Sequence, residues 1–126
     1  MITHIIHDRD AKTGEGIPLP PAVEEGIRIA KSYLDSELDR LSAIPIFAEW
    51  LIRKAPTGKL DIQFSLTSEG VGIAEVPYSI ETFSDPKMLK SCLRRDIWYF
   101  TTYIAVELKQ DIKKLKSELV ASGVED

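Results

Sequence analysis

Cysteine and histidine are scarce in this chain of 126 residues, which contains one cysteine and two histidines. The single cysteine, Cys92, cannot form a disulfide within the chain, and this favours a reducing compartment such as the cytoplasm. Its place among apolar helix positions indicates a small buried hydrophobe rather than a reactive thiol. No apolar run reaches the ~18 residues of a membrane-spanning helix, and no signal-peptide pattern opens the chain. We therefore expect a cytoplasmic protein without a membrane partner.

Recognisable catalytic and cofactor motifs are also lacking. The phosphate-binding patterns G-x-x-x-x-G-K-[ST] and G-x-G-x-x-G after a strand do not occur, and neither does Gly-x-Ser-x-Gly. His4, His7, Asp8 and Asp10 carry donor atoms of the kind that bind zinc. However, a spacing of three on a strand turns His4 and His7 to opposite faces, and the chain has no third histidine. We predict no bound metal and no cofactor, and the sequence identifies no catalytic residue.

The most informative feature that is present is a long amphipathic pattern over residues 85–122. Asp85 is a good N-cap, Pro86 suits the first helical turn, and Gly123 follows where a helix would stop. We predict one helix of roughly 55 Å, which would protrude from a globule of this size unless it is bent or paired. Its apolar side chains recur at steps of three or four residues and form one seam: Leu89, Leu93, Ile97, Phe100, Ile104, Leu108, Ile112, Leu115 and Leu119.

The middle of this helix is apolar almost all round, because Trp98, Tyr99, Tyr103 and Val106 lie away from the seam. Such a helix must be covered on more than one side, by the rest of its chain, by a second copy or by a partner, and the sequence leaves all three open. The β-branched and aromatic residues over 97–106 also leave a strand as a competing interpretation. We predict self-association through an apolar girdle that consists of Ile97, Trp98, Phe100, Tyr103 and Ile104.

The first part of the chain contains a second helical pattern. We predict a helix from Pro21 to Leu41, with a kink or break at Pro45 and a further helical piece over residues 46–54. The first residues of the segment 1–20 have a composition that favours a short strand. The rest of this segment is predicted to be an ordered loop or a mobile arm. The predicted apolar seam of this first helix consists of Val23, Ile27, Ala30, Leu34, Leu38 and Leu41.

Between the two helical regions the apolar period changes to two, which predicts an antiparallel β-hairpin around the glycine-containing turn 68–72. Pro77 lacks a backbone donor and should confine the second strand to a sheet edge there. Helix, hairpin and long helix together predict a single α+β domain over residues 1–126. The side chains predicted to face the core are Leu60, Ile62, Phe64 and Leu66 before the turn, and Ala74, Val76, Tyr78 and Ile80 after it.

One pair of carboxylates, Asp61 and Glu75, could meet across this hairpin and act as general acid and base. Both are expected on the polar outer face, where charged residues need no catalytic explanation. The sequence therefore leaves enzymatic activity undecided and favours a protein that is not an enzyme.

The net charge of −4 is unevenly distributed. Residues 87–116 carry eight basic and three acidic side chains, whereas residues 55–86 carry one basic and five acidic ones. Cations beside aromatic side chains can bind phosphates and stack bases, although most nucleic-acid modules are more basic than this chain. The candidate binding residues on the long helix are Lys90, Arg94, Arg95, Lys109, Lys113 and Lys116.

These patterns favour a small cytoplasmic interaction or assembly protein that is not an enzyme and that forms a homodimer through its long helix. A different protein partner would fit the same apolar surface. The first alternative is a nucleic-acid-binding accessory protein that uses the basic face of the helix. The second alternative is a small enzyme with an unrecognised site.

Overall fold

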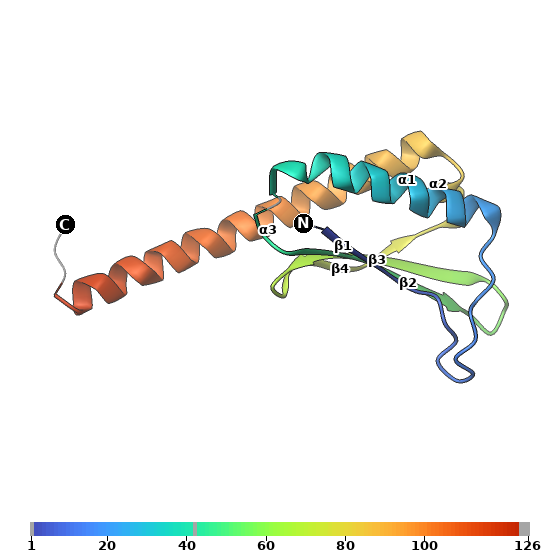
Figure 1. Ribbon diagram of the computed structural model, residues 1–126, viewed down its shortest axis with the longest axis horizontal. Helices are drawn as coiled ribbons and strands as arrows, with labels where there is room; N and C mark the ends of the chain where they lie inside the picture. The colour runs from blue at the N-terminus through green and yellow to red at the C-terminus, as the bar shows by residue number, and fades with distance from the viewer. Residues whose placement is uncertain (1, 42, 124–126) are drawn as a thin grey trace.

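The computed structural model describes residues 2–41 and 43–123. Within them, four strands form one sheet in the order β1-β2-β3-β4, and three α-helices lie over one face of that sheet (Figure 1). The chain is thus an α+β domain, as its sequence predicts. Its elements are β1 (Ile2–His7), α1 (Pro21–Glu37), the 3-10 turn η1 (Asp39–Leu41), β2 (Ile46–Lys54), β3 (Leu60–Ser68), β4 (Val71–Tyr78), α2 (Ile80–Phe83) and α3 (Pro86–Ala121).

The sheet combines one parallel and two antiparallel strand pairs. Strand β1 runs parallel to β2, with Ile2 opposite Ile46, and α1 provides the long crossover that parallel neighbours require. The pairs β2–β3 and β3–β4 are antiparallel. Because β4 is an edge strand, the missing N–H of Pro77 leaves no gap in an inner ladder, as the sequence predicts.

Residues 46–54 form strand β2, so the prediction of a helical piece there is wrong. Phe47, Trp50 and Leu51 have the spacing of a helical face, but the same segment also has an apolar residue at every second position. As a strand it can bond to β1 and β3 at once and occupy the inside of the sheet. The β2 side chains that face the helices and are buried are Ile46, Ala48, Trp50 and Ile52.

Helix α1 buries the predicted seam, although it ends at Glu37 and only the turn η1 continues to Leu41. Pro45 therefore precedes β2 and does not kink a helix. Gly26 lies where α1 passes α2, and a Cβ atom at this position would lie 2.3 Å from Cδ1 of Phe83. The buried seam residues are Val23, Ile27, Ala30, Leu34 and Leu38.

The predicted hairpin is present as β3 and β4. Its two turn residues, Glu69 and Gly70, have φ values of 50° and 80°, and positive φ at both central positions is typical of a type I′ turn. The β4 prediction needs a correction, because the register shifts between Phe64 and Leu66. This bulge leaves Ala74 exposed.

The core lies between the sheet and the helices, and aromatic rings occupy its centre. The ring of Trp50 lies 4.4 Å from that of Phe64, 5.1 Å from that of Tyr78 and 5.3 Å from that of Phe83, measured between ring centroids. Three strands and α2 supply these four side chains, so this cluster fixes the helical layer on the sheet.

Helix α3 confirms the predicted long helix and rules out the strand interpretation of residues 97–106. The carboxylate of Asp85 caps it by accepting bonds from the backbone N–H groups of Lys87 and Met88, at 3.1 and 3.3 Å. The first part of α3 lies over the sheet, and its second part extends well beyond the domain (Figure 1). In the part of the chain that the structure describes, no helix has both the length and the apolar character to cross a membrane.

Candidate functional site

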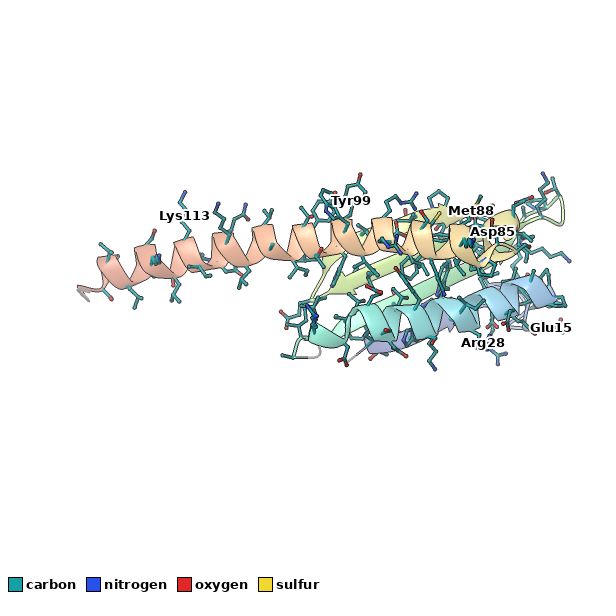
Figure 2. The ribbon with its side chains drawn as sticks, turned by 90° about the horizontal axis from the view of Figure 1, so that it is seen from above. Glu15, Arg28, Asp85, Met88, Tyr99 and Lys113 are labelled. Carbon is teal, nitrogen blue, oxygen red and sulfur yellow. The ribbon has the colours of Figure 1, made fainter. Side chains whose placement is uncertain are left out.

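The apolar seam of α3 is covered over its first part and exposed over its second. Leu89, Leu93 and Phe100 are fully buried in the core, and Ile97 and Ile104 are half-buried against it. Every residue from 105 to 123 is exposed. Beyond a crevice that residues up to Asp111 share with the β3–β4 turn, this projecting part stands clear of the other elements (Figure 2). The chain's own core therefore covers the seam only up to Ile104. The rest of the seam is an exposed apolar surface.

The open part of the seam consists of four large aliphatic residues, which we call the distal stripe: Leu108, Ile112, Leu115 and Leu119. Their side chains are 57%, 47%, 55% and 43% exposed, respectively. The steps between them are four, three and four residues, which is the spacing of a coiled-coil seam, with leucine at d, isoleucine at a, leucine at d and leucine at a. Scattered exposed hydrophobes are normal, but a periodic row on a helix without support is not.

Charges of opposite sign flank the distal stripe. On one side the e positions hold Lys109 and Lys116, and on the other the g positions hold Asp111 and Glu118. Where α3 leaves the domain, Asp111 also lines a crevice of about 250 Å³ together with Glu69 and Glu107 and with apolar side chains. The residues that line this crevice include three carboxylates and no cation.

The predicted apolar girdle does not form one surface. Phe100 is completely buried in the core of its own chain, and Ile97 and Ile104 also pack on that core. Trp98 and Tyr103 are 62% and 46% exposed. They form an exposed aromatic group with Tyr99, whose ring lies 5.1 Å from that of Trp98 and 6.4 Å from that of Tyr103; in Figure 2 Tyr99 points away from α1.

The predicted basic residues fall into two groups. Lys109, Lys113 and Lys116 lie on the projecting part of α3, as the label of Lys113 in Figure 2 shows. The other three lie on the part that packs on the domain. Among these, Arg94 donates from Nε to the Tyr33 hydroxyl of α1 at 3.3 Å. The sequence predicts one basic face of six residues. In the structure three of them lie beside the domain and three lie on the projecting part of α3.

Lys90 borders a groove between α1 and α3 with a volume of about 310 Å³. Three residues with hydroxyl groups, Ser32, Tyr33 and Ser36, also line it, together with Arg28. The guanidinium of Arg28 is paired with Glu25 on the same helix, which lowers the pKa of that carboxyl. Hydroxyls and cations are the donors that bind phosphate oxygens, so this groove has the chemistry of a weak anion site.

Asp96 of α3 is a buried carboxylate that no pattern in the sequence indicated. It is 1% exposed and accepts a hydrogen bond from the Tyr78 hydroxyl of β4. Its second oxygen accepts a hydrogen bond from Nε of Arg95 at 3.1 Å and forms an ion pair with that guanidinium, whose Nη2 lies 3.0 Å away. Burial raises the pKa of Asp96 above its ordinary value, although the bonds from Tyr78 and Arg95 oppose this. Burial and the bond to Asp96 raise the pKa of Tyr78. With its oxygens occupied, Asp96 fastens α3 to the sheet.

The N-terminal histidines point to different elements. His4 bonds Asp35 of α1 at 2.7 Å, and His7 lies 3.9 Å from Glu49 of β2. Asp10 accepts bonds from the backbone N–H groups of Lys12 and Thr13, which lower its pKa. Within the residues that the structure describes, no group of three or more histidine, cysteine or acidic side chains is arranged to hold a metal ion.

The carboxylates proposed as an acid–base pair are not brought together. Asp61 lies opposite Arg53, with 3.6 Å between the charged groups, whereas the backbone N–H of Glu75 at the β4 bulge donates to the Ser65 hydroxyl. Cys92 is half-buried against the core, as a small hydrophobe would be.

Comparison of the chain with protein-family models, with curated proteins and with solved structures gives no match.

Proposed function

We propose that this protein is a cytoplasmic, non-enzymatic assembly module that associates with a second copy of itself through the distal stripe of α3. The observation that carries the proposal is the exposed coiled-coil spacing of Leu108, Ile112, Leu115 and Leu119 on a helix that leaves its domain. A row with charges of opposite sign on its two sides is complementary to another copy of itself. The cytoplasm fits the single cysteine.

The size of the stripe predicts an association of modest strength. Covering the exposed part of one such side chain stabilises by about 1 kcal/mol, and two copies contribute eight of them. Association itself costs about 4–15 kcal/mol of lost freedom, so the two quantities are comparable. We therefore expect a dimer whose population depends on protein concentration.

Sedimentation or light scattering over a range of concentrations tests the proposal. The unaltered protein should change from monomer to dimer as concentration rises, and Ile112→Lys should remain monomeric. Val106→Lys is the matched control, because Val106 is a 50% exposed aliphatic residue of the same helix that lies outside the stripe. A monomer at every concentration, or equal effects of the two substitutions, would contradict the proposal.

The groove between α1 and α3 supports a second candidate function, the binding of phosphate groups such as those of nucleic acid. Its lining by Lys90 and three hydroxyl groups, with Arg94 beside it, favours this role over a mere solvated face. Fluorescence anisotropy of a labelled single-stranded oligonucleotide provides the test. Lys90→Glu and Arg94→Glu should weaken binding and lower its salt dependence, because each lost phosphate contact removes about 0.7–0.9 units of slope.

Lys113→Glu is the control for this second candidate, because Lys113 is a cation of α3 on the projecting part. If the groove binds phosphate, this substitution should change binding less than Lys90→Glu does. Equal losses from both would show that affinity follows the overall charge of the helix. No binding at low salt would remove the candidate.

A further inference from the structure

The direction in which two copies meet follows from the charges beside the distal stripe. In a two-stranded coil with parallel helices, each g position faces the e position five residues further along the other helix. Asp111 then faces Lys116 of the partner subunit, and by symmetry this attractive pair occurs twice. Asp111 also lines the acidic crevice with Glu69 and Glu107, and no cation is among the residues that line this crevice. A lysine of the partner subunit beside Asp111 is therefore attracted by these carboxylates as well.

Antiparallel helices would place like charges together. In that arrangement g positions face g positions and e positions face e positions. With the stripe residues layered so that Leu108 meets Leu119, Lys109 faces Lys116 of the partner subunit, and Asp111 faces Glu118 of the partner subunit. All of these contacts are repulsive, so charge opposes the antiparallel form.

The heptad seam can also be followed into the part of α3 that packs on the domain. When the heptad is followed from Leu108 back toward the domain, its next positions are Ala105, Thr101 and Trp98. Ala105 and Trp98 are exposed and Thr101 is half-buried, whereas Phe100 lies outside the heptad seam and is buried in the core. The heptad seam therefore differs from the core-facing side of α3, although Leu108 and Asp111 also border the crevice beside the β3–β4 turn.

We infer that two copies form a parallel two-stranded coiled coil over residues 105–122, with both α+β domains at the same end. This inference rests on the proposed self-association and adds its direction. Isoleucine at a and leucine at d, as at Ile112 and Leu115, also favour two strands over three or four. A parallel pair presents two identical domains side by side, so a ligand of one domain would be bound twice by the assembly.

Disulfide cross-linking distinguishes the two directions. In a Cys92→Ala background, Leu108→Cys and Leu119→Cys are prepared separately and equilibrated in a glutathione redox buffer. Parallel helices bring each new cysteine beside its own copy, so each variant alone should form a covalent dimer. Antiparallel helices bring position 108 beside position 119, so only a mixture of the two variants would cross-link.

A charge reversal gives an independent test with opposite signs for the two directions. In the parallel form Lys116→Glu places a glutamate against Asp111 and should weaken the dimer, and the added change Asp111→Lys should restore it. In the antiparallel form Lys116→Glu would face Lys109 and strengthen the dimer. Cross-linking only in the mixture, or a stronger dimer with Lys116→Glu, would overturn the inference and leave the proposed self-association intact; a monomer in every experiment would overturn both.

Discussion

The two halves of α3 have the same apolar spacing and opposite surroundings. Leu93, in the first half, is fully buried in the core, whereas Leu115, in the second half, is 55% exposed. Both belong to a continuous run of helical steps, and nothing local to either residue distinguishes them. The comparison shows that a helical seam predicts that its surface will be covered. It does not predict which element covers it.

The boundary between the halves is set by the size of the domain. Ile104 is the last half-buried residue of α3, and the helix continues to Ala121 for more than four further turns, most of which lie beyond the sheet and α1 (Figure 1). An isolated helix of that length is marginal in water. The helical conformation of the second half is therefore stabilised by good helix formers or by a second copy. That of the first half is stabilised by packing on its own domain.

The largest expected effect sharpens this contrast with one matched pair of substitutions. Leu93→Ala should lower the free energy of unfolding by about 2–5 kcal/mol, because it leaves a cavity in the core. Leu115→Ala should leave the unfolding of the dilute monomer nearly unchanged and weaken association instead. Chemical denaturation at low concentration, combined with sedimentation, measures both quantities. Similar losses of monomer stability would show that the second half also packs on the domain.

Substitution at the boundary should produce an intermediate effect. Ile104→Asp places a carboxylate on the half-buried side of α3, next to Glu107 in the acidic crevice. We expect a loss of about 2 kcal/mol, because partial burial removes water from a charge without supplying a partner. Thermal unfolding of Ile104→Asp and Ile104→Asn separates the contribution of the charge from that of the lost packing. A melting temperature equal to that of the unaltered protein would place the boundary earlier in the helix.

The buried carboxylate of Asp96 gives the stability of the first half of α3 a pH dependence. Asp96 has a pKa above its ordinary value of 3.8, so the folded chain holds its proton at pH values where the unfolded chain has lost it. Stability from this group is therefore present at low pH and falls as pH rises from about 3.8 through the raised pKa. Compared with Asp96→Asn, the unaltered protein should lose free energy of unfolding as pH rises through this range. At higher pH the difference between the two proteins should stay constant. Parallel pH profiles of the two proteins would contradict this.

The smallest expected effect concerns the end of α3. Glu118→Ala should change the free energy of unfolding by no more than about 0.5 kcal/mol, because Glu118 is exposed near a helix end. In the parallel coil its g position faces Gly123 of the partner subunit, which offers no cation, so association should also change little. Denaturation and sedimentation of this variant provide the baseline against which the effects of Lys116→Glu are judged.

Features that depend on local chemistry could be predicted from the sequence. The seam of α1, the alternation of β3, the turn at Glu69 and Gly70, and the cap at Asp85 all follow from spacing or from the conformational range of single residues. Each needs contacts among neighbours within a few positions, so one sequence window contains its cause. The distal stripe was also visible in this way, although it could not be told apart from the rest of the seam.

Only the tertiary structure decided the features that depend on distant partners. Residues 46–54 became a strand because β1 and β3 offer ladders on both sides, which outweighed a helical spacing in the segment itself. The bulge at Glu75 turned Ala74 outward, and the Tyr78 hydroxyl gave a buried Asp96 its partner. The end of the sheet and of α1 divided one uniform seam into a buried part and an open part, because burial is a property of what lies opposite a residue and a sequence window contains only what lies beside it.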